Sequence, residues 1–155
     1  MSLSLNPETS VTAHGSTGEA PANSGLRVPR RFTVSGVHPF DTVQWEKRRT
    51  VITNPDGSVV FKADDVEVPS TWSQLATDIV ASKYRRRAGV PGALGRENSV
   101  RQAVHRLVRT IRSAGEQQGG YFAGPEDAEA FEAELAYMLV HHTGELKAPI
   151  WCTSM

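Results

Sequence analysis

Cysteine is nearly absent from this sequence, and its scarcity removes several classes of protein at once. Cys152 is the single cysteine among 155 residues. No internal disulfide can form, and no zinc cluster with several thiolate ligands can be built within the chain. The sequence therefore does not describe a disulfide-stabilised secreted domain, and its composition fits the reducing conditions of the cytoplasm.

Long apolar runs and a net charge are also missing. No apolar stretch approaches the ~18 residues of a membrane-spanning helix, and the first residues lack the basic and then apolar pattern of a signal peptide. The 17 basic and 17 acidic residues cancel, which argues against a partner held by bulk electrostatic attraction. We therefore expect a cytoplasmic protein, with neither a membrane nor nucleic acid as its partner.

Aromatic residues are missing from the first part of the chain. Residues 1–27 are rich in Ser, Thr, Gly, Ala, Asn and Pro and contain no Phe, Trp or Tyr. Such a segment buries too little apolar surface to offset the entropy lost on ordering, so we predict a disordered tail. A docking or regulatory tail is the functional alternative.

A β-hairpin is the clearest pattern that is present. Two runs of β-branched and aromatic residues, 50–53 and 58–61, flank the sequence Asn54-Pro55-Asp56-Gly57. Proline presets φ in a turn, and glycine adopts positive φ at no steric cost. We therefore predict an extended segment followed by a hairpin over residues 28–69.

Three amphipathic helices are predicted within residues 70–144. The first would begin at Ser70 or Thr71, with Gln74 placed for a capping box. The second would begin at Asn98 or Ser99, three residues before Gln102, and end at Gly115. The third would run from Gly124-Pro125 to Gly144. The apolar stripe of the first helix comprises Trp72, Leu75, Ala76, Ile79, Val80 and Tyr84.

The three apolar stripes are expected to pack on one another. Burying one Leu, Ile or Phe side chain contributes roughly 2 kcal/mol, so a dozen such positions outweigh any surface ion pair. The predicted fold class is mainly α with a small β-hairpin (α+β): a three-helix domain preceded by an extended segment and the hairpin.

Residue types that could carry chemistry are present without the spacing that chemistry needs. The five histidines show no metal-ligand pattern, and the adjacent carboxylates Asp64-Asp65 and Glu126-Asp127 are typical of a solvated turn and a helix start. A basic patch formed by Arg85-Arg86-Arg87 and the arginines of the second helix could bind nucleic acid. A solvated face is the alternative, and the link of about ten residues is too long for a helix-turn-helix.

Several short segments resemble, in order and spacing, one protein family. They are Gly36-Val37-His38-Pro39-Phe40-Asp41, Trp45-Glu46, the hairpin, Ser82-Lys83-Tyr84, Glu97-Asn98-Ser99-Val100-Arg101-Gln102, Tyr121-Phe122-Ala123, and Asp127-Ala128-Glu129-Ala130-Phe131 continuing to Leu135-Ala136-Tyr137. Together they strongly resemble the N-terminal region of class II ribonucleotide reductases. These adenosylcobalamin-dependent (vitamin B12-dependent) enzymes reduce ribonucleotides to deoxyribonucleotides, and the resemblance runs from about residue 36 to 151.

The resemblance implies a helical N-terminal domain that precedes a ten-stranded α/β barrel. In the family, the barrel supplies the substrate site and three essential cysteines, and cobalamin generates the radical. This chain has one cysteine. We therefore expect a non-catalytic portion of a ribonucleoside-diphosphate reductase that acts as a scaffold in deoxyribonucleotide biosynthesis for DNA replication. It would bind no cofactor itself, and its partner would be a separate reductase catalytic chain.

The last residues, 145–155, resemble the family's entry to the barrel only in part. Pro149 and Trp151 match that pattern and would mark the edge of the substrate site by resemblance, whereas Lys147 and Ala148 differ. Cys152 stands where the family has phenylalanine, so no redox role is assigned to it. We predict a truncated or split N-terminal domain, inactive alone. The alternative is an independent binding module for nucleic acid, acting through its arginine-rich helices.

Overall fold

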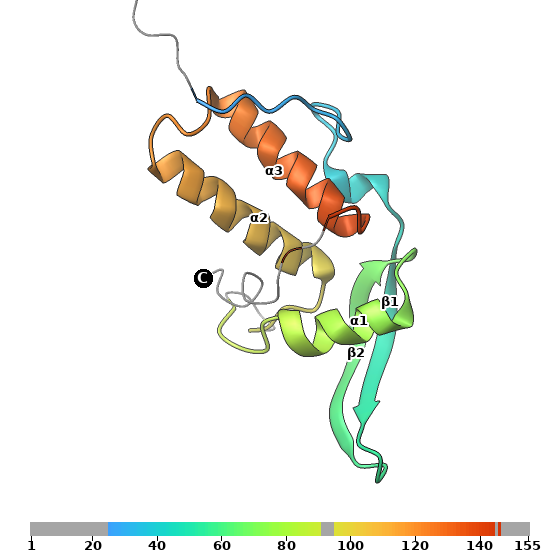
Figure 1. The fold of residues 1–155 in the computed structure, drawn as a ribbon. Helices are drawn as coiled ribbons and strands as arrows, with labels where there is room; N and C mark the ends of the chain where they lie inside the picture. Colours follow the sequence, from blue (N-terminus) through green and yellow to red (C-terminus); the bar gives the residue numbers. More distant parts are fainter. Residues whose placement is uncertain (1–24, 91–94, 145, 147–155) are drawn as a thin grey trace, which may run out of the picture.

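The computed structural model describes residues 25–90, 95–144 and 146 of the chain. A hairpin projects from one end of a pair of long helices, and a short helix crosses beside it (Figure 1). In chain order the elements are η1 (Pro39–Thr42), β1 (Trp45–Thr53), β2 (Val59–Pro69), α1 (Gln74–Ile79), η2 (Val80–Tyr84), α2 (Val100–Gln117) and α3 (Pro125–Val140). The predicted α+β fold class is confirmed.

The hairpin is longer than the sequence pattern indicated. β1 and β2 pair antiparallel from Trp45 opposite Pro69 to Thr53 opposite Val59, and a turn that contains Gly57 at φ 84° joins them. A lone two-stranded sheet is marginal in water. This one is stabilised at its base, where Val66 and Val68 are fully buried in the core.

The first helix begins later than predicted, and the proposed caps Ser70 and Thr71 are wrong. Ser73 is the N-cap, and its hydroxyl accepts a hydrogen bond from the Ala76 amide at 3.1 Å. Trp72 lies before the helix because its indole N–H donates to the Val140 carbonyl at 2.8 Å. This long-range bond holds Trp72 in place ahead of the helix. At the other end of α1, a single π-helical turn, η2, continues the helix to Tyr84.

The predicted apolar stripe of the first helix is buried only in part. Trp72 and Val80 belong to the core. Leu75 is 68% exposed and Ile79 is 41% exposed, contrary to the prediction. Six residues of α-helix cannot place every apolar position against the core, so one side of α1 remains apolar and open to solvent.

The starts of the two long helices are confirmed. Ser99 caps α2 in a capping box with Gln102, whose side chain accepts from the Ser99 amide at 3.1 Å. Gly124 and Pro125 open α3. Both elements lie side by side and pack through the core (Figure 1).

The predicted ends of these helices are wrong. α2 passes through Gly115, which is buried, because a glycine there admits the ring of Phe122. A Cβ at this position would lie 2.7 Å from Cε2 of that ring. α3 ends at Val140 rather than Gly144. After its last residue, the amides of Thr143 and Gly144 both donate to the Met138 carbonyl and close the helix.

The segment before η1 lies along α3 (blue in Figure 1). The predicted disordered tail of residues 1–27 lies outside the described residues as far as residue 24. Leu26 donates to the Tyr121 carbonyl at 2.7 Å, and the Val28 amide donates to Asp127 Oδ1 at 2.8 Å. Further along, the amide of Thr33 donates to Glu134 Oε1 at 2.9 Å. Carboxylates on α3 therefore hold a segment that lacks regular structure of its own.

Candidate functional site

The two site residues taken from the resemblance cannot be placed. Pro149 and Trp151 lie outside the described residues, as does Cys152. Their predicted position at the edge of a substrate site stays a prediction. The described residues offer other surfaces, which the sequence alone did not reveal.

An apolar groove of about 320 Å³ lies between the first helix and the C-terminal end of α3. Its floor is set by Trp72, whose ring centroid lies 4.2 Å from that of His142. The lining residues are Trp72, Ala76, Ile79, Val80, Tyr84, Leu139, His142, Gly144 and Leu146.

This groove combines two features of a docking surface. Ile79 exposes 41% of its area beside the groove floor, and large apolar groups around a concavity mark binding surfaces. Leu146, the last described residue, also lines it, so the chain that leaves α3 passes along this face. The sequence missed the groove because its lining comes from segments about 70 residues apart.

The arginines of α2 do not form an open basic patch. Arg106 pairs with Glu97 at 2.8 Å, and both side chains are largely buried. Arg112 pairs with Glu132 at 2.7 Å and with Glu116 at 2.8 Å. The two remaining arginines are paired as well, Arg101 with Glu67 and Arg109 with Glu132.

A nucleic-acid track needs cations that are available to phosphates. Along α2 each arginine already faces a carboxylate, and those of Glu67, Glu97 and Glu132 from neighbouring segments offset much of the positive charge of this helix. Residues 85–99 separate η2 from α2, which is much longer than the turn of a helix-turn-helix motif. The described geometry therefore does not favour nucleic-acid binding through α2.

The paired carboxylates have structural partners. Asp127 receives the Val28 amide, and Asp64 pairs with Arg49 at 3.2 Å and with Lys62 at 3.6 Å. Within the described ranges, no group of three or more His, Cys, Asp or Glu side chains could hold a metal ion. One acid of each pair, Asp64 and Asp127, is therefore engaged by a cation or a backbone amide.

Adenosylcobalamin does not fit the cavities found in the described part of the chain. The four that are described measure about 320 to 390 Å³. Drug-sized ligands already fill clefts of about 300 to 1,000 Å³, and a corrinoid with its nucleotide tail and adenosyl group is much larger.

None of the helices in the described ranges has the length and apolar character needed to cross a membrane.

The comparisons with known proteins point to one family. The family model for class II vitamin B12-dependent ribonucleotide reductase matches residues 46–142. The vitamin B12-dependent ribonucleotide reductase of Streptomyces clavuligerus is 48% identical over 149 residues, which cover 95% of this chain and 15% of that protein. Similar relatives occur in Streptomyces coelicolor, 50% identical over 84% of this chain and 13% of that protein, and in Rhodopirellula baltica, 41% identical over 83% and 12%.

The chain thus spans about one seventh of the length of the curated relatives it matches. The matched residues include the hairpin, α1, α2 and α3, the elements that build the core. The chain belongs to the class II vitamin B12-dependent ribonucleotide reductase family, of which it carries the N-terminal domain.

Proposed function

We propose that this chain is a non-catalytic scaffold that docks against the catalytic region of a vitamin B12-dependent ribonucleotide reductase. The apolar groove beside α1, lined by Trp72, Ile79 and Leu146, is the observation that supports docking. In the proposed complex, the catalytic region covers this groove.

The chemistry would belong to the catalytic region. In the intact enzyme, adenosylcobalamin would supply the radical that starts reduction of a ribonucleoside diphosphate to its deoxy form. In this proposal the described residues contribute surface and not reacting groups; the buried carboxylates of Glu97 and Glu134 are engaged in hydrogen bonds that hold the fold. The proposed location is the cytoplasm, where deoxynucleotides are made in bacteria.

A chimera tests this function. This chain replaces the matching region of the Streptomyces clavuligerus relative, and cobalamin-dependent formation of deoxynucleotides is measured. We expect the chimera to be active, and the chain alone to be inactive when given adenosylcobalamin and a dithiol. Deoxynucleotide formation by the chain alone would contradict the non-catalytic role, and a folded but inactive chimera would contradict the scaffold.

A matched pair of variants tests the groove within that chimera. Ile79→Lys places a cation in the groove, whereas Val34→Lys adds the same charge at a residue that is 68% exposed and does not line the groove. Burial of the exposed part of Ile79 contributes about 1 kcal/mol, and lysine would add the cost of desolvating a charge. We expect Ile79→Lys alone to lower the melting temperature and turnover of the chimera. Equal effects of the two variants would show that the groove is not the docking surface.

A further inference from the structure

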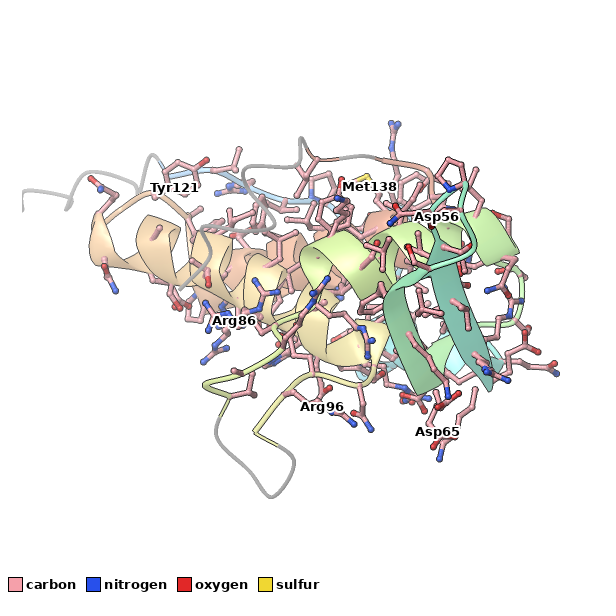
Figure 2. The ribbon with its side chains drawn as sticks, turned by 90° about the horizontal axis from the view of Figure 1, so that it is seen from below. Asp56, Asp65, Arg86, Arg96, Tyr121 and Met138 are labelled. Carbon is pink, nitrogen blue, oxygen red and sulfur yellow. The ribbon has the colours of Figure 1, made fainter. Side chains whose placement is uncertain are left out.

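A second cavity, of about 390 Å³, lies between the hairpin, η2 and the residue stretch that leads into α2. Figure 2 shows Arg86 and Arg96 on the same side of the domain, with their guanidinium groups beyond the ribbon. The lining residues are Phe61, Lys62, Ala63, Asp64, Asp65, Ala81, Arg85, Arg86, Arg87, Arg96, Glu97 and Asn98. We call it the arginine cavity.

Two of the three carboxylates of the arginine cavity are engaged by cations or amides. Glu97 accepts hydrogen bonds from Arg106 at 2.8 and 3.3 Å and from the Arg86 amide at 2.8 Å. Asp64 pairs with Arg49 and Lys62. Asp65 is exposed. Among the described residues, Asp64 and Glu97 therefore form no ion pair with Arg85, Arg87 or Arg96.

Those arginines crowd one another. Arg85 donates from Nη1 to the Glu97 carbonyl at 3.0 Å, while its Nε is buried without a hydrogen-bond partner. Burial lowers the pKa of Arg85, and the positive charges of Arg96 and Arg87 lower it further, against the opposing effect of Glu97. Among the described residues, Arg96 forms no ion pair. A buried donor without an acceptor, beside concentrated positive charge, is costly unless an anion is present.

We propose that the arginine cavity binds a small phosphate-bearing ligand. A phosphoryl group presents several acceptor oxygens, and guanidinium groups match it with paired N–H donors. The volume suits a diphosphate or a small nucleotide. The Arg87 guanidinium lies 4.7 Å from the centroid of the Phe61 ring, which holds this cation at the cavity wall.

A polymer is a poorer occupant than a small ligand. Nucleic acid requires a continuous track of available cations, but the arginines of α2 beyond the cavity are paired with carboxylates. The positive charge of this site is confined to one concavity. The ligand proposal is independent of the proposed scaffold function, because it concerns this chain alone and a different surface.

Calorimetric titration of the full chain with inorganic pyrophosphate at low ionic strength tests the proposal. Arg96→Gln removes one of the exposed cations of the cavity, and Arg31→Gln removes one from an exposed position that lines none of the described cavities. A hydrogen bond to a charged group corresponds to a change in affinity of about tenfold or more. We expect Arg96→Gln to weaken binding by that factor, Arg31→Gln to leave it unchanged, and added salt to weaken binding.

Further titrations separate the sources of the phosphoryl group. A nucleoside diphosphate that binds more tightly than pyrophosphate would identify a nucleotide ligand, and equal affinities would identify the phosphate groups as the recognised part. The proposal fails if pyrophosphate does not bind at millimolar concentration, or if the two arginine variants bind equally well. It also fails if a single-stranded oligonucleotide binds more tightly than either ligand and Arg96→Gln does not affect that binding.

Discussion

Glu134 is the residue whose removal should most clearly separate the N-terminal segment from α3. Its carboxylate is 8% exposed and accepts hydrogen bonds from the amide of Phe32, the amide of Thr33 and the hydroxyl of Thr33, at distances from 2.6 to 3.1 Å. Glu134→Gln keeps the shape of the side chain. It removes the negative charge, keeps one acceptor oxygen that can take the place of Oε1, and puts an NH₂ donor in place of Oε2, which shares the Phe32 amide.

The expected loss of stability follows from these contacts. A hydrogen bond to a charged group contributes about 1.5 to 3 kcal/mol and one to a neutral group about 0.5 to 1.5 kcal/mol, so loss of the charge weakens each of the three bonds. Because the three donors belong to adjacent residues and their contributions are not additive, we expect Glu134→Gln to lower the free energy of unfolding by about 2 to 3 kcal/mol. Glu129→Gln is the matched control on the same helix. Glu129 is 60% exposed and pairs with Arg30 of the same segment, so its loss should cost under about 1 kcal/mol.

Two measurements check this prediction. Urea unfolding gives the free energy, and trypsin cleavage after Arg30 and Arg31 reports release of the segment, which we expect to accelerate in Glu134→Gln. Equal unfolding energies and equal cleavage rates for the two variants would refute the anchoring role of Glu134.

The pH dependence adds an independent check on Glu134. Burial raises the pKa of its carboxyl, but hydrogen bonds from Thr33 and Phe32 lower it by more, so the net pKa lies below the ordinary 4.5. A carboxyl with a lowered folded-state pKa stabilises the protein above the unfolded-state pKa and loses that contribution as pH falls through the folded-state pKa. The stability difference between wild type and Glu134→Gln should therefore be constant near neutral pH and shrink below about pH 4.5.

Two further predictions concern the helices. Gly115→Ala should lower the free energy of unfolding by about 1 to 2 kcal/mol, because the new Cβ would lie 2.7 Å from the Phe122 ring. This clash should outweigh the higher helix propensity of alanine. A raised melting temperature of the variant would contradict this packing. Glu97→Gln should cost about 3 kcal/mol in urea unfolding, because it leaves the largely buried Arg106 without its counter-charge. Glu116→Gln, at a carboxylate 42% exposed, should cost under about 1 kcal/mol, and equal losses for both would refute the buried pair.

Local chemistry explains which elements could be predicted from the sequence. The turn that contains Gly57, the capping box of Ser99 with Gln102, and the Gly124-Pro125 start of α3 each depend on residues a few positions apart. Neighbours in sequence supply every partner in these motifs, so their spacing was sufficient. The family resemblance also followed from ordered short segments.

The ends of the helices and the buried polar groups could not be predicted in this way. Gly115 is typical of a helix end, and only the ring of Phe122 packed against it explains why α2 continues. Similarly, the true start of α1 depends on the bond from Trp72 to Val140, which is 68 residues away. Contacts between distant residues override local preference because burial contributes more free energy than propensity.

The sequence by itself determined the family, the hairpin and the number and starts of the long helices, because these depend on periodicity, turn residues and caps. Only the tertiary structure decided which charges are used and which surfaces are open. It paired the arginines of α2 with carboxylates, anchored the N-terminal segment to Glu134, and left the apolar groove and the arginine cavity exposed. The physical reason is that ion pairing and burial depend on distance in space, which spacing along the chain does not specify.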